Sequence, residues 1–309
     1  MCYAFFMEAV FWGTRGSLPR PLRPEEVVRK LTNLAAGEDG FATRGTYGGN
    51  TACVELRGAA AAIVCDAGSG LRDCGNALVA ALEPETPLTV HLFISHPHWD
   101  HIQGFPFFAP AYREHTTIFI YGGHEELRRA FTIQQSPPFF PIAFPDLPAT
   151  IRFVLMRPGT PLSVAGVTVS CYRQNHPGDS YGYRFTAADG ASLVYATDSE
   201  VRMEDASETA GYIDFMRDAD LLIFDAQYDF LHAESYRRDW GHASNIAAIE
   251  LALDAGVREL ALFHADPAMS DEDLDRVEND SREFALHVAN GRTIRVRVAY
   301  DGLQLPVRR

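Results

Sequence analysis

Four side chains that can bind metal ions lie within six positions of the chain, in the segment His96-Pro-His98-Trp-Asp100-His101. The segment directly follows the apolar, β-branched run at 88–95, which predicts a strand. Residues two apart in an extended segment project to the same side, so His96 and His98 can bind one ion together. A turn after them would bring Asp100 and His101 toward a neighbouring position. Imidazole and carboxylate in this mixture suit zinc, and also manganese or iron, so we predict a metal site here.

The elements that must position this segment are short strands separated by helices. Apolar runs predict strands at 9–12, 52–56, 61–65, 88–95, 117–121, 151–156, 167–172, 181–186 and 193–196, with helices at 71–82 and 124–130. In the last third, helices at 208–217, 244–255 and 271–289 precede strands at 221–225, 259–263 and 293–298. Strands with interleaved helices in each half predict an α/β fold with four layers, αββα, in which two mixed sheets pack together with helices outside.

The domain organisation is simple, because the sequence shows no internal repeat, low-complexity tract or flexible linker. We therefore predict one domain over residues 1–309. Residues 20–49 are polar and show little hydrophobic pattern. This predicts a long surface loop, an insertion without chemistry of its own, with a short helix near 25–34.

Composition and charge limit the classes of partner. Hydrophobic residues make up 47% of the chain and charged residues 22%, which is typical of a globular protein. The formal charge of −14 repels phosphate backbones, so we expect no stable nucleic-acid partner. A small anionic, nucleotide-like substrate fits if metal ions supply positive charge at the site. A homodimer is compatible with the sequence.

Neither a membrane span nor a disulfide framework is expected. No apolar run approaches the roughly 20 residues that cross a bilayer. The apolar segment 1–12 lacks a basic leader and is interrupted by Glu8, so we expect a first strand and not a signal peptide. The five cysteines are odd in number and contain no C-x-x-C pair, which argues for a reducing compartment. We therefore expect a cytoplasmic protein.

The segment at 96–101 has the pattern H-x-H-x-D-H, and with it the chain resembles the metallo-β-lactamase superfamily. That family adds a later His, a bridging Asp and a final His, each after a strand, and this sequence offers His176, Asp198 and His264. The resemblance, which covers nearly the whole chain, implies two sets of ligands and one bridge: His96, His98 and His176 for one ion, Asp100, His101 and His264 for the other, and Asp198 between them. Asp100 is assigned to the catalytic residues as well.

Asp66 follows the predicted strand 61–65 in the turn Asp66-Ala-Gly-Ser-Gly70. Similar proteins use an Asp there to accept a hydrogen bond from a ligand histidine, which fixes the tautomer of that ring. The alternative is an Asp that only forms the turn beside glycine.

A second His–Asp pair lies outside the ligand set. His242 stands in Trp-Gly-His-Ala-Ser244, before the predicted helix 244–255, and Asp225 ends the predicted strand 221–225. This pairing resembles the ribonuclease Z branch of the superfamily and its phosphodiesterase relatives. The resemblance implies that His242 is a general acid or stabilises the leaving group, and that Asp225 orients its ring. The alternative is a His that caps or packs at the start of the helix.

One feature of ribonuclease Z is missing. Ribonuclease Z carries a long, basic, Gly-rich arm for tRNA, in many members between the third His and the bridging Asp. Here His176 and Asp198 are only 22 positions apart, which leaves room for a hairpin. With the acidic charge, this argues against tRNA processing. The motifs F-W-G-x-R-G-S, Y-G-G-N-T, H-W-D-H-I-Q-G and W-G-H resemble instead small bacterial metallohydrolases related to cyclic-phosphate diesterases.

Substrate contacts are suggested by an amide and by aromatic residues. Asn50, in Gly-Gly-Asn-Thr51, can hydrogen-bond a substrate oxygen or simply complete the turn. Trp99 and Phe107 can wall a base or sugar ring, and core packing is the alternative for most of the aromatic cluster to which they belong, with Phe105, Phe108, Phe139 and Phe140.

Two divalent ions that share a carboxylate also share a water, and they lower its pKa far enough to leave hydroxide at neutral pH. We therefore predict a dinuclear hydrolase using Zn²⁺, or else Mn²⁺ or Fe²⁺, in which the bridging hydroxide attacks a small, cyclic phosphodiester. The alternatives are a thioester, lactone or β-lactam hydrolase on the same site, and an RNA-processing nuclease of ribonuclease Z type. An iron oxidoreductase usually replaces the second His by Glu, and a decayed binding module should have lost ligands.

Overall fold

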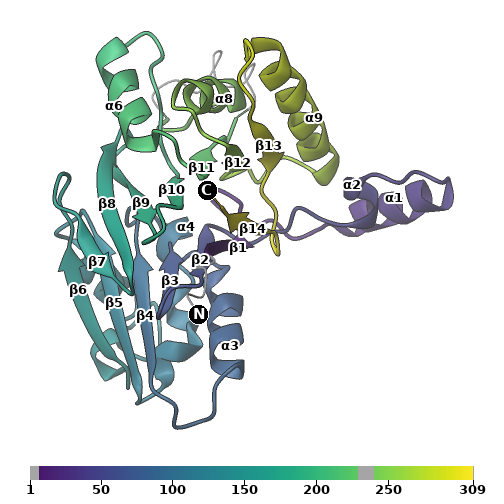
Figure 1. Ribbon diagram of the computed structural model, residues 1–309. Helices are drawn as coiled ribbons and strands as arrows, with labels where there is room; N and C mark the ends of the chain where they lie inside the picture. Colours follow the sequence, from purple (N-terminus) through teal and green to yellow (C-terminus); the bar gives the residue numbers. More distant parts are fainter. Residues whose placement is uncertain (1–6, 229–239, 309) are drawn as a thin grey trace, which may run out of the picture.

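The structure is a computed structural model that describes residues 7–228 and 240–308. Two seven-stranded sheets form its centre (Figure 1). The first sheet has the spatial order β14 (Gln304–Val307), β1 (Met7–Gly13), β2 (Cys53–Arg57), β3 (Ala62–Cys65), β4 (Leu88–Phe93), β5 (Thr116–Gly122) and β6 (Thr150–Leu155). The second has the order β13 (Arg295–Val298), β12 (Glu259–Phe263), β11 (Leu221–Asp225), β10 (Ser192–Ala196), β9 (Ser180–Thr186), β8 (Val167–Gln174) and β7 (Leu162–Val164).

Each sheet combines a parallel part with an antiparallel part. Strands β3 to β6 run parallel, as do β10 to β13, and the other neighbours pair antiparallel. Parallel strands end at the same edge of a sheet, so the residues that follow them gather there. This edge collects the polar residues that the sequence analysis singles out.

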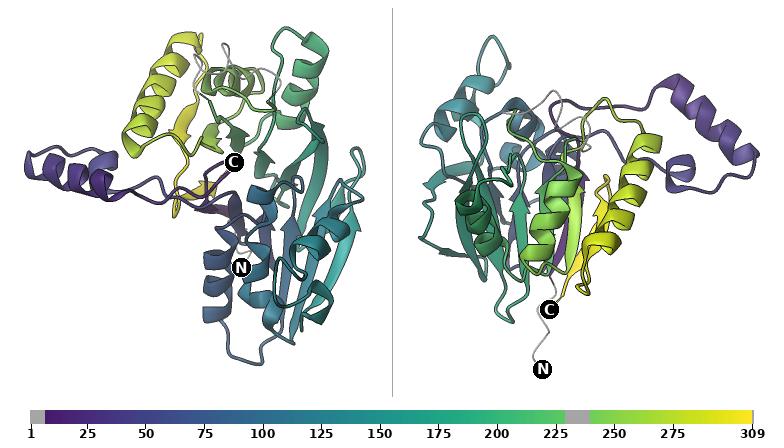
Figure 2. Two further views of the ribbon diagram at one scale, coloured as in Figure 1. Left: turned by 180° about the vertical axis from the view of Figure 1, so that it is seen from behind. Right: turned by 90° about the horizontal axis from the view of Figure 1, so that it is seen from above.

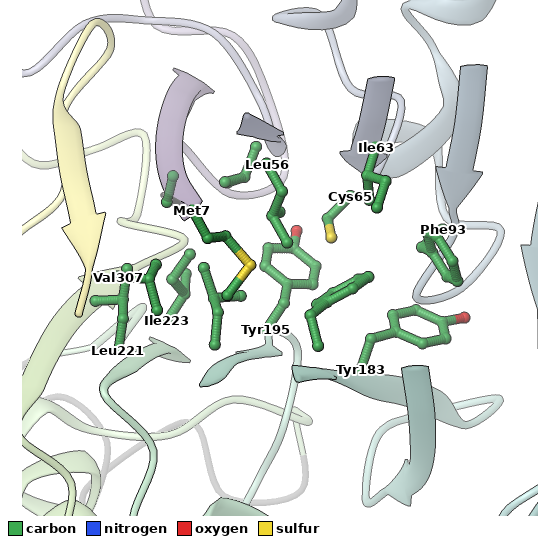
Figure 3. Packing of buried hydrophobic residues seen from close by; sticks show 14 of the residues in the cluster. Met7, Leu56, Ile63, Cys65, Phe93, Tyr183, Tyr195, Leu221, Ile223 and Val307 are labelled. Atoms are coloured by element: carbon green, nitrogen blue, oxygen red, sulfur yellow. The ribbon is translucent and has the colours of Figure 1, made fainter. Parts of the chain in front are cut away.

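Apolar side chains fill three layers between the elements. Between the sheets, Ile63 and Phe93 of the first sheet face Tyr183 and Ile223 of the second (Figure 3). The outer face of the first sheet is covered by α3 (Leu71–Ala80), η1 (Phe105–Phe107), η2 (Ala109–Tyr112), α5 (Leu127–Gln134) and η3 (Phe144–Asp146). The outer face of the second is covered by α6 (Ala206–Met216), α8 (Asn245–Asp254) and α9 (Asp271–Val288) (Figure 2). The predicted αββα fold is confirmed.

The expectation that residues 20–49 form mainly a loop is wrong. They contain α1 (Pro24–Ala35) and α2 (Phe41–Arg44), which project sideways from the sheets as an arm, residues 18–46 (Figure 1, Figure 2). The short helix expected near 25–34 is confirmed. Pro24 occupies the first helical position, and the Glu26 carboxylate accepts a hydrogen bond from the Arg23 backbone N at 2.8 Å. Pro24 and Glu26 thus mark the start of the helix, although the apolar residues that follow do not face the core.

Two short strands also escaped the sequence analysis. Strand β14 contains Pro306 and lies at the edge of the first sheet, and β7 has three residues at the edge of the second. Edge strands tolerate proline and need only one pairing partner, so their apolar pattern is weak.

The described cysteines confirm the absence of a disulfide framework in this part of the chain, since they are buried and unpaired: Cys53, Cys65, Cys74 and Cys171. No helix within residues 7–228 and 240–308 combines the length and apolar content needed to cross a membrane.

A buried arginine fixes the root of the arm, that is, the two segments around Arg15 and Gly48 that flank residues 18–46. Arg15 has no exposed surface, and its Nε donates to the carbonyl oxygen of Gly48 at 3.1 Å. Its Nη1 donates to the carbonyl oxygens of Asp266 and Met269, and its Nη2 lies 3.6 Å from Asp271 Oδ1. Burial lowers the pKa of Arg15 to about 10, so the guanidinium stays charged at neutral pH. Through these contacts the buried guanidinium of Arg15 holds the two segments of the root against each other and against the residues around Met269.

A carboxylate fixes the same root from the other side. Asp301 Oδ2 accepts hydrogen bonds from the backbone N of Gly49 and of Asn50, both at 3.0 Å, and Oδ1 accepts one from the Thr14 hydroxyl at 3.1 Å. Burial raises the pKa of Asp301 to about 6, in spite of these donors, from an ordinary value of 3.8.

The Asp301→Asn variant should therefore change how stability depends on pH. A raised carboxyl pKa means that the folded chain binds the proton more tightly than the unfolded chain. The stability contributed by protonated Asp301 is thus present below about pH 4 and lost as the pH rises through about 6. Asparagine keeps an acceptor for the two backbone donors and can donate to Thr14. Relative to this variant, the wild type should lose about 2 kcal/mol of unfolding free energy between about pH 4 and pH 7.

Urea denaturation of both proteins at the two pH values measures this difference. A wild type and a variant that follow the same pH dependence would contradict a strongly raised pKa for Asp301.

Candidate metal centre

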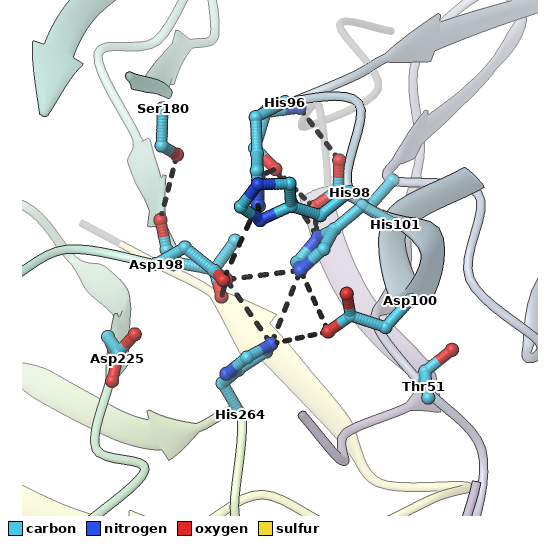
Figure 4. A network of polar contacts seen from close by, with 12 residues as sticks. Thr51, His96, His98, Asp100, His101, Ser180, Asp198, Asp225 and His264 are labelled. Carbon is cyan, nitrogen blue, oxygen red and sulfur yellow. Dashed lines mark hydrogen bonds and ion pairs between the residues drawn. The ribbon is translucent and has the colours of Figure 1, made fainter. Parts of the chain in front are cut away.

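The predicted ligands converge where the strands of both sheets end (Figure 4). They follow four strands: His96, His98, Asp100 and His101 come after β4, the last two on α4 (Trp99–Ile102), His176 after β8, Asp198 after β10 and His264 after β12. All of these except His98 are buried. The structure thus brings together every metal ligand that the sequence analysis names.

Sharp turns at the strand ends aim several of these side chains. Asp66, Asp198 and His264 have φ angles of 58°, 53° and 67°, in the left-handed region. Each lies within two residues of the end of β3, β10 or β12. Asp and His are among the non-glycine residues that tolerate this conformation, and such strain concentrates at functional sites. Figure 4 shows Asp198 and His264 pointing toward the centre of the cluster.

Three histidine nitrogens form the first donor cluster. His96 Nε2 lies 2.8 Å from His98 Nδ1, which lies 3.2 Å from His176 Nε2. Burial lowers the pKa of His96 and His176, and partial desolvation of the ring together with the charge of His101 lowers that of His98, which favours the neutral form that binds metal. Three converging ring nitrogens cannot all be satisfied by protons shared among them, whereas one divalent cation satisfies all three. This cluster is able to bind a metal ion.

The second donor cluster contains two carboxylates. His101 Nε2 lies 3.2 Å from Asp100 Oδ2, from Asp198 Oδ1 and from His264 Nε2. Burial disfavours the charged His101 ring, but the negative charges of Asp198, Asp100 and Asp66 outweigh burial and raise its pKa. Several carboxylates around one buried imidazole favour a cation at this position.

Asp198 lies between the two clusters. Its Oδ1 is 3.2 Å from His101 Nε2 and 3.3 Å from His264 Nε2. Its Oδ2 is 3.6 Å from His96 Nε2 and 3.8 Å from His176 Nε2. One carboxylate thus faces both donor sets, which is the position that the resemblance implies for a bridging ligand.

The orientation of two ligand rings is set by contacts on their far side. Asp66 Oδ2 accepts a hydrogen bond from His101 Nδ1 at 2.7 Å, so in the neutral ring Nε2 is the unprotonated nitrogen and faces the cluster. His176 Nδ1 donates to the carbonyl oxygen of Gly241 at 2.8 Å, which leaves Nε2 for a metal in the same way. Such contacts fix the tautomer of a ligand histidine. The contact expected for Asp66 is therefore present.

The second His–Asp pair lies directly beside both clusters. His242 Nδ1 is 2.7 Å from Asp225 Oδ2, and its ring centroid is 5.2 Å from that of His176 and 5.0 Å from that of His264. Burial disfavours the charged ring, but the charge and hydrogen bond of Asp225, with the charges of Asp198 and other ligands, raise the pKa of His242 to about 9. The raised pKa favours the protonated form of this ring.

A family model described as the β-lactamase superfamily domain matches residues 62–265, a span that contains all of these site residues. The chain belongs to this superfamily. It is a hydrolase of the metallo-β-lactamase fold with His and Asp clusters that can bind metal.

Relatives within the superfamily agree in fold. YhfI of Bacillus subtilis, a probable metallo-hydrolase, is 28% identical over 205 residues, 63% of this chain and 74% of YhfI. Its crystal structure has a TM-score of 0.67 at 20% identity and covers 98% of this chain and 100% of YhfI. Ribonuclease Z of Oceanobacillus iheyensis is 22% identical over 268 residues, 69% of this chain and 84% of that enzyme. The crystal structure of a diphosphatase from the PhnP family has a TM-score of 0.64 at 16% identity, covering 97% of each chain.

The predicted substrate residues differ in their surroundings. Asn50 Oδ1 accepts a hydrogen bond from Ser69 Oγ at 3.0 Å, which favours the turn over a substrate contact. Trp99, between His98 and Asp100 in the sequence, and Phe107 are both exposed, and the Phe107 ring packs edge-on against Phe140 at 5.6 Å. The core alternative is confirmed for Phe105 and Phe108, which are fully buried.

The loop at residues 13–17 borders the site, as its motif led us to expect, but sequence reasoning missed that it does so through its backbone. The Ser17 backbone N donates to Asp100 Oδ2 at 2.7 Å, and Gln227 Nε2 donates to Ser17 Oγ at 3.0 Å. A Cβ atom at Gly16 would lie 2.5 Å from His264 Nδ1, so only glycine allows this approach. The motif G-T-R-G-S contains both residues, but a backbone donor leaves no signal in the residue type.

Two further partners of Asp66 were also missed. The Tyr195 hydroxyl donates to Asp66 Oδ2 at 2.7 Å, and the Ser95 hydroxyl donates to the same oxygen at 2.8 Å. Ser95 was detectable as a polar residue that closes an apolar strand directly before His96. Tyr195 was not, because a tyrosine inside an apolar strand predicts core packing.

The Asp66→Asn variant should bind zinc about 10–100-fold more weakly than the wild type. An amide N–H at the Oδ2 position cannot accept from His101 Nδ1. It would drive the ring proton to Nε2, the atom that faces the other ligands. Competition with a chelating dye measures the affinity, and circular dichroism confirms the fold.

The matched control is Tyr195→Phe, which removes one hydrogen bond to Asp66 and leaves the tautomer of His101 unchanged. We expect this control to weaken zinc binding less than about tenfold. Equal affinities for Asp66→Asn and the wild type would mean that Asp66 serves only the turn.

Proposed function

We propose that the protein is a two-metal phosphodiesterase that cleaves a small, cyclic phosphodiester. The observation that carries this proposal is the His242–Asp225 pair beside both donor clusters. Hydrolysis of a thioester, lactone or β-lactam on the same metal site does not require such a pair. Cleavage of a phosphodiester produces a poor alkoxide leaving group, which needs a proton from a group outside the ligand set.

The donor set fits two divalent cations. His96, His98 and His176 would hold one, Asp100, His101 and His264 the other, with Asp198 shared, and the nitrogen-rich chemistry suits Zn²⁺, with Mn²⁺ or Fe²⁺ as alternatives. When bound, such cations lower the pKa of a water between them and offset the charge of a phosphate. The neutral rings of the first cluster and the carboxylates of the second are suited to that task.

The chain itself controls the proton on the leaving-group side. Asp225 holds His242 through Nδ1 at 2.7 Å, so the transferable proton of the ring is the one on Nε2. Asp225 is not part of the proposed ligand set, and its effect on the ring persists when the other carboxylates bind cations. Transfer of the Nε2 proton to the departing oxygen leaves a neutral ring that Asp225 still orients.

The short segment between His176 and Asp198 supports a small substrate. The residues between His176 and Asp198 are occupied by β9 and β10, which pair as a tight hairpin. The acidic chain therefore offers no long basic arm at this position. Trp99, which lies between the proposed ligands His98 and Asp100 in the sequence, and Phe107 expose their rings, and such aromatic faces can stack on a base or sugar. These features support a small nucleotide-like substrate over tRNA, although one relative is a ribonuclease Z.

The His242→Ala variant should lose about 10²–10⁴-fold in kcat/KM on a cyclic nucleotide, because its alkoxide leaving group needs the Nε2 proton. On bis(p-nitrophenyl) phosphate, whose leaving group needs no proton, the loss should stay below about tenfold. Steady-state kinetics on both substrates with zinc- and manganese-loaded enzyme measure this contrast.

A matched control is His115→Ala, which removes another histidine 2.8 Å from a carboxylate, Glu85, on the surface. It should leave both rates unchanged. Equal losses on both substrates for His242→Ala would exclude proton donation by this ring. Turnover of thioesters or lactones but of no phosphodiester would favour the alternative hydrolase function.

Metal content tests the dinuclear proposal separately from the substrate. The purified wild type should bind about two zinc or manganese ions per chain, and His176→Ala about one, because it removes a ligand from the first cluster only. Metal analysis after dialysis measures the ratio. A wild type that binds fewer than about one ion per chain would overturn the proposal.

A further inference from the structure

Helix α1 in the arm exposes its apolar side and buries polar residues. Its apolar residues Val27, Val28, Leu31 and Leu34 are between 41% and 63% exposed, while its polar residues Glu26 and Lys30 are buried. The four apolar residues recur at helical spacing and form one stripe on the outer side. A helix at a protein surface ordinarily buries its apolar stripe, so this stripe is suited to contact with another molecule.

Polar contacts fix the orientation of the stripe. Lys30 Nζ lies 2.7 Å from Asp271 Oδ2 and donates to the carbonyl oxygen of Gly45 at 2.9 Å. Arg29 is paired with Glu272 at 3.0 Å, on the same helix α9. The views in Figure 1 and Figure 2 agree that α1 projects away from the sheets. An isolated helix of twelve residues is only marginally stable in water, so contact with a partner would stabilise the arm.

The chain carries a second exposed apolar surface, the Pro/Phe segment (residues 133–142). Ile133, Phe139 and Ile142 are between 41% and 66% exposed, and the segment also exposes Pro137, Pro138 and Pro141. No charged residue occurs between Arg129 and Asp146. With a formal charge of −14, two copies of this chain repel each other, and association is favoured only where uncharged surfaces meet.

We propose that a second copy of this chain covers α1, with the arm of each copy packed on the Pro/Phe segment of the other around a twofold axis. A twofold axis forms each contact twice, so one apolar stripe and one apolar segment per chain make a closed dimer. Pairing of two α1 stripes alone would fall short of the roughly 800 Å² that each partner buries in a standard interface. The exposed ring of Phe139 and the exposed prolines of the Pro/Phe segment add apolar area to the contact.

Charge also argues against a membrane as the occupant. The exposed charges of the arm balance, with Glu25, Glu38 and Asp39 against Arg23, Arg29 and Arg44, and the chain as a whole is strongly acidic, so the arm offers no basic surface. Anionic lipid surfaces attract basic segments and repel acidic ones.

Sedimentation of the full-length protein across the micromolar range tests the proposal. The wild type should be a dimer, and the double variant Val28→Asp/Leu31→Asp should raise the dimer dissociation constant about 100-fold or more, because it places two charges in an apolar contact. Phe139→Asp should have the same effect from the other side of the contact. The matched control is Leu286→Asp on α9, a leucine that is 82% exposed and outside the proposed contact, which should remain dimeric.

A cross-linking experiment keeps the test independent of folding defects in these variants. Leu31→Cys and Phe139→Cys, made in separately tagged copies and mixed, should form a disulfide between copies, whereas Leu286→Cys mixed with Phe139→Cys should not. A monomeric wild type, or a dimer that forms no cross-link between positions 31 and 139, would overturn the proposal. Both outcomes are independent of metal content and activity.

Discussion

A single buried carboxylate joins the two sheets at the point where the predicted metal ligands converge. Asp66 has no exposed surface and accepts four hydrogen bonds, from the backbone N and hydroxyl of Ser95, the ring of His101 and the hydroxyl of Tyr195. Ser95 and His101 follow β4 in the first sheet, whereas Tyr195 lies on β10 in the second. An unpaired buried charge costs about 3–5 kcal/mol, so the donors and Asp66 must be in place together. The contact that aligns a ligand ring therefore also aligns the sheets.

The parts of this structure that could be predicted from the sequence are those that depend on short runs of neighbouring residues. Strands such as β11 and β12 are buried on both faces, so they appear as unbroken apolar runs that end in Asp225 or precede His264. The ligands stand at those ends, where the residue type changes abruptly from apolar to polar. Both the layers of the fold and the ligand positions follow from that change.

The parts that sequence could not predict depend on contacts across the chain. Tyr195 has the residue type of a core side chain, and only the opposite sheet supplies the carboxylate that it binds. Helix α1 has helical spacing, but its apolar side faces outward, so the usual link between an apolar stripe and the core fails. Strand β14 is defined by pairing with β1 across almost the whole length of the chain. None of these features is encoded within a short window of residues.

The two sides of the candidate metal centre differ in how readily they tolerate amino-acid replacement. On one side, Gly16 and the backbone N of Ser17 touch His264 and Asp100 directly, and no side chain larger than hydrogen fits at position 16. Amino-acid replacement cannot reshape a wall built from main chain without displacing a ligand. On the other side, the exposed side chain of Trp99 can be exchanged without displacing a ligand. Evolution of new substrate preference on this scaffold, or its redesign in the laboratory, is thereby confined to the aromatic side.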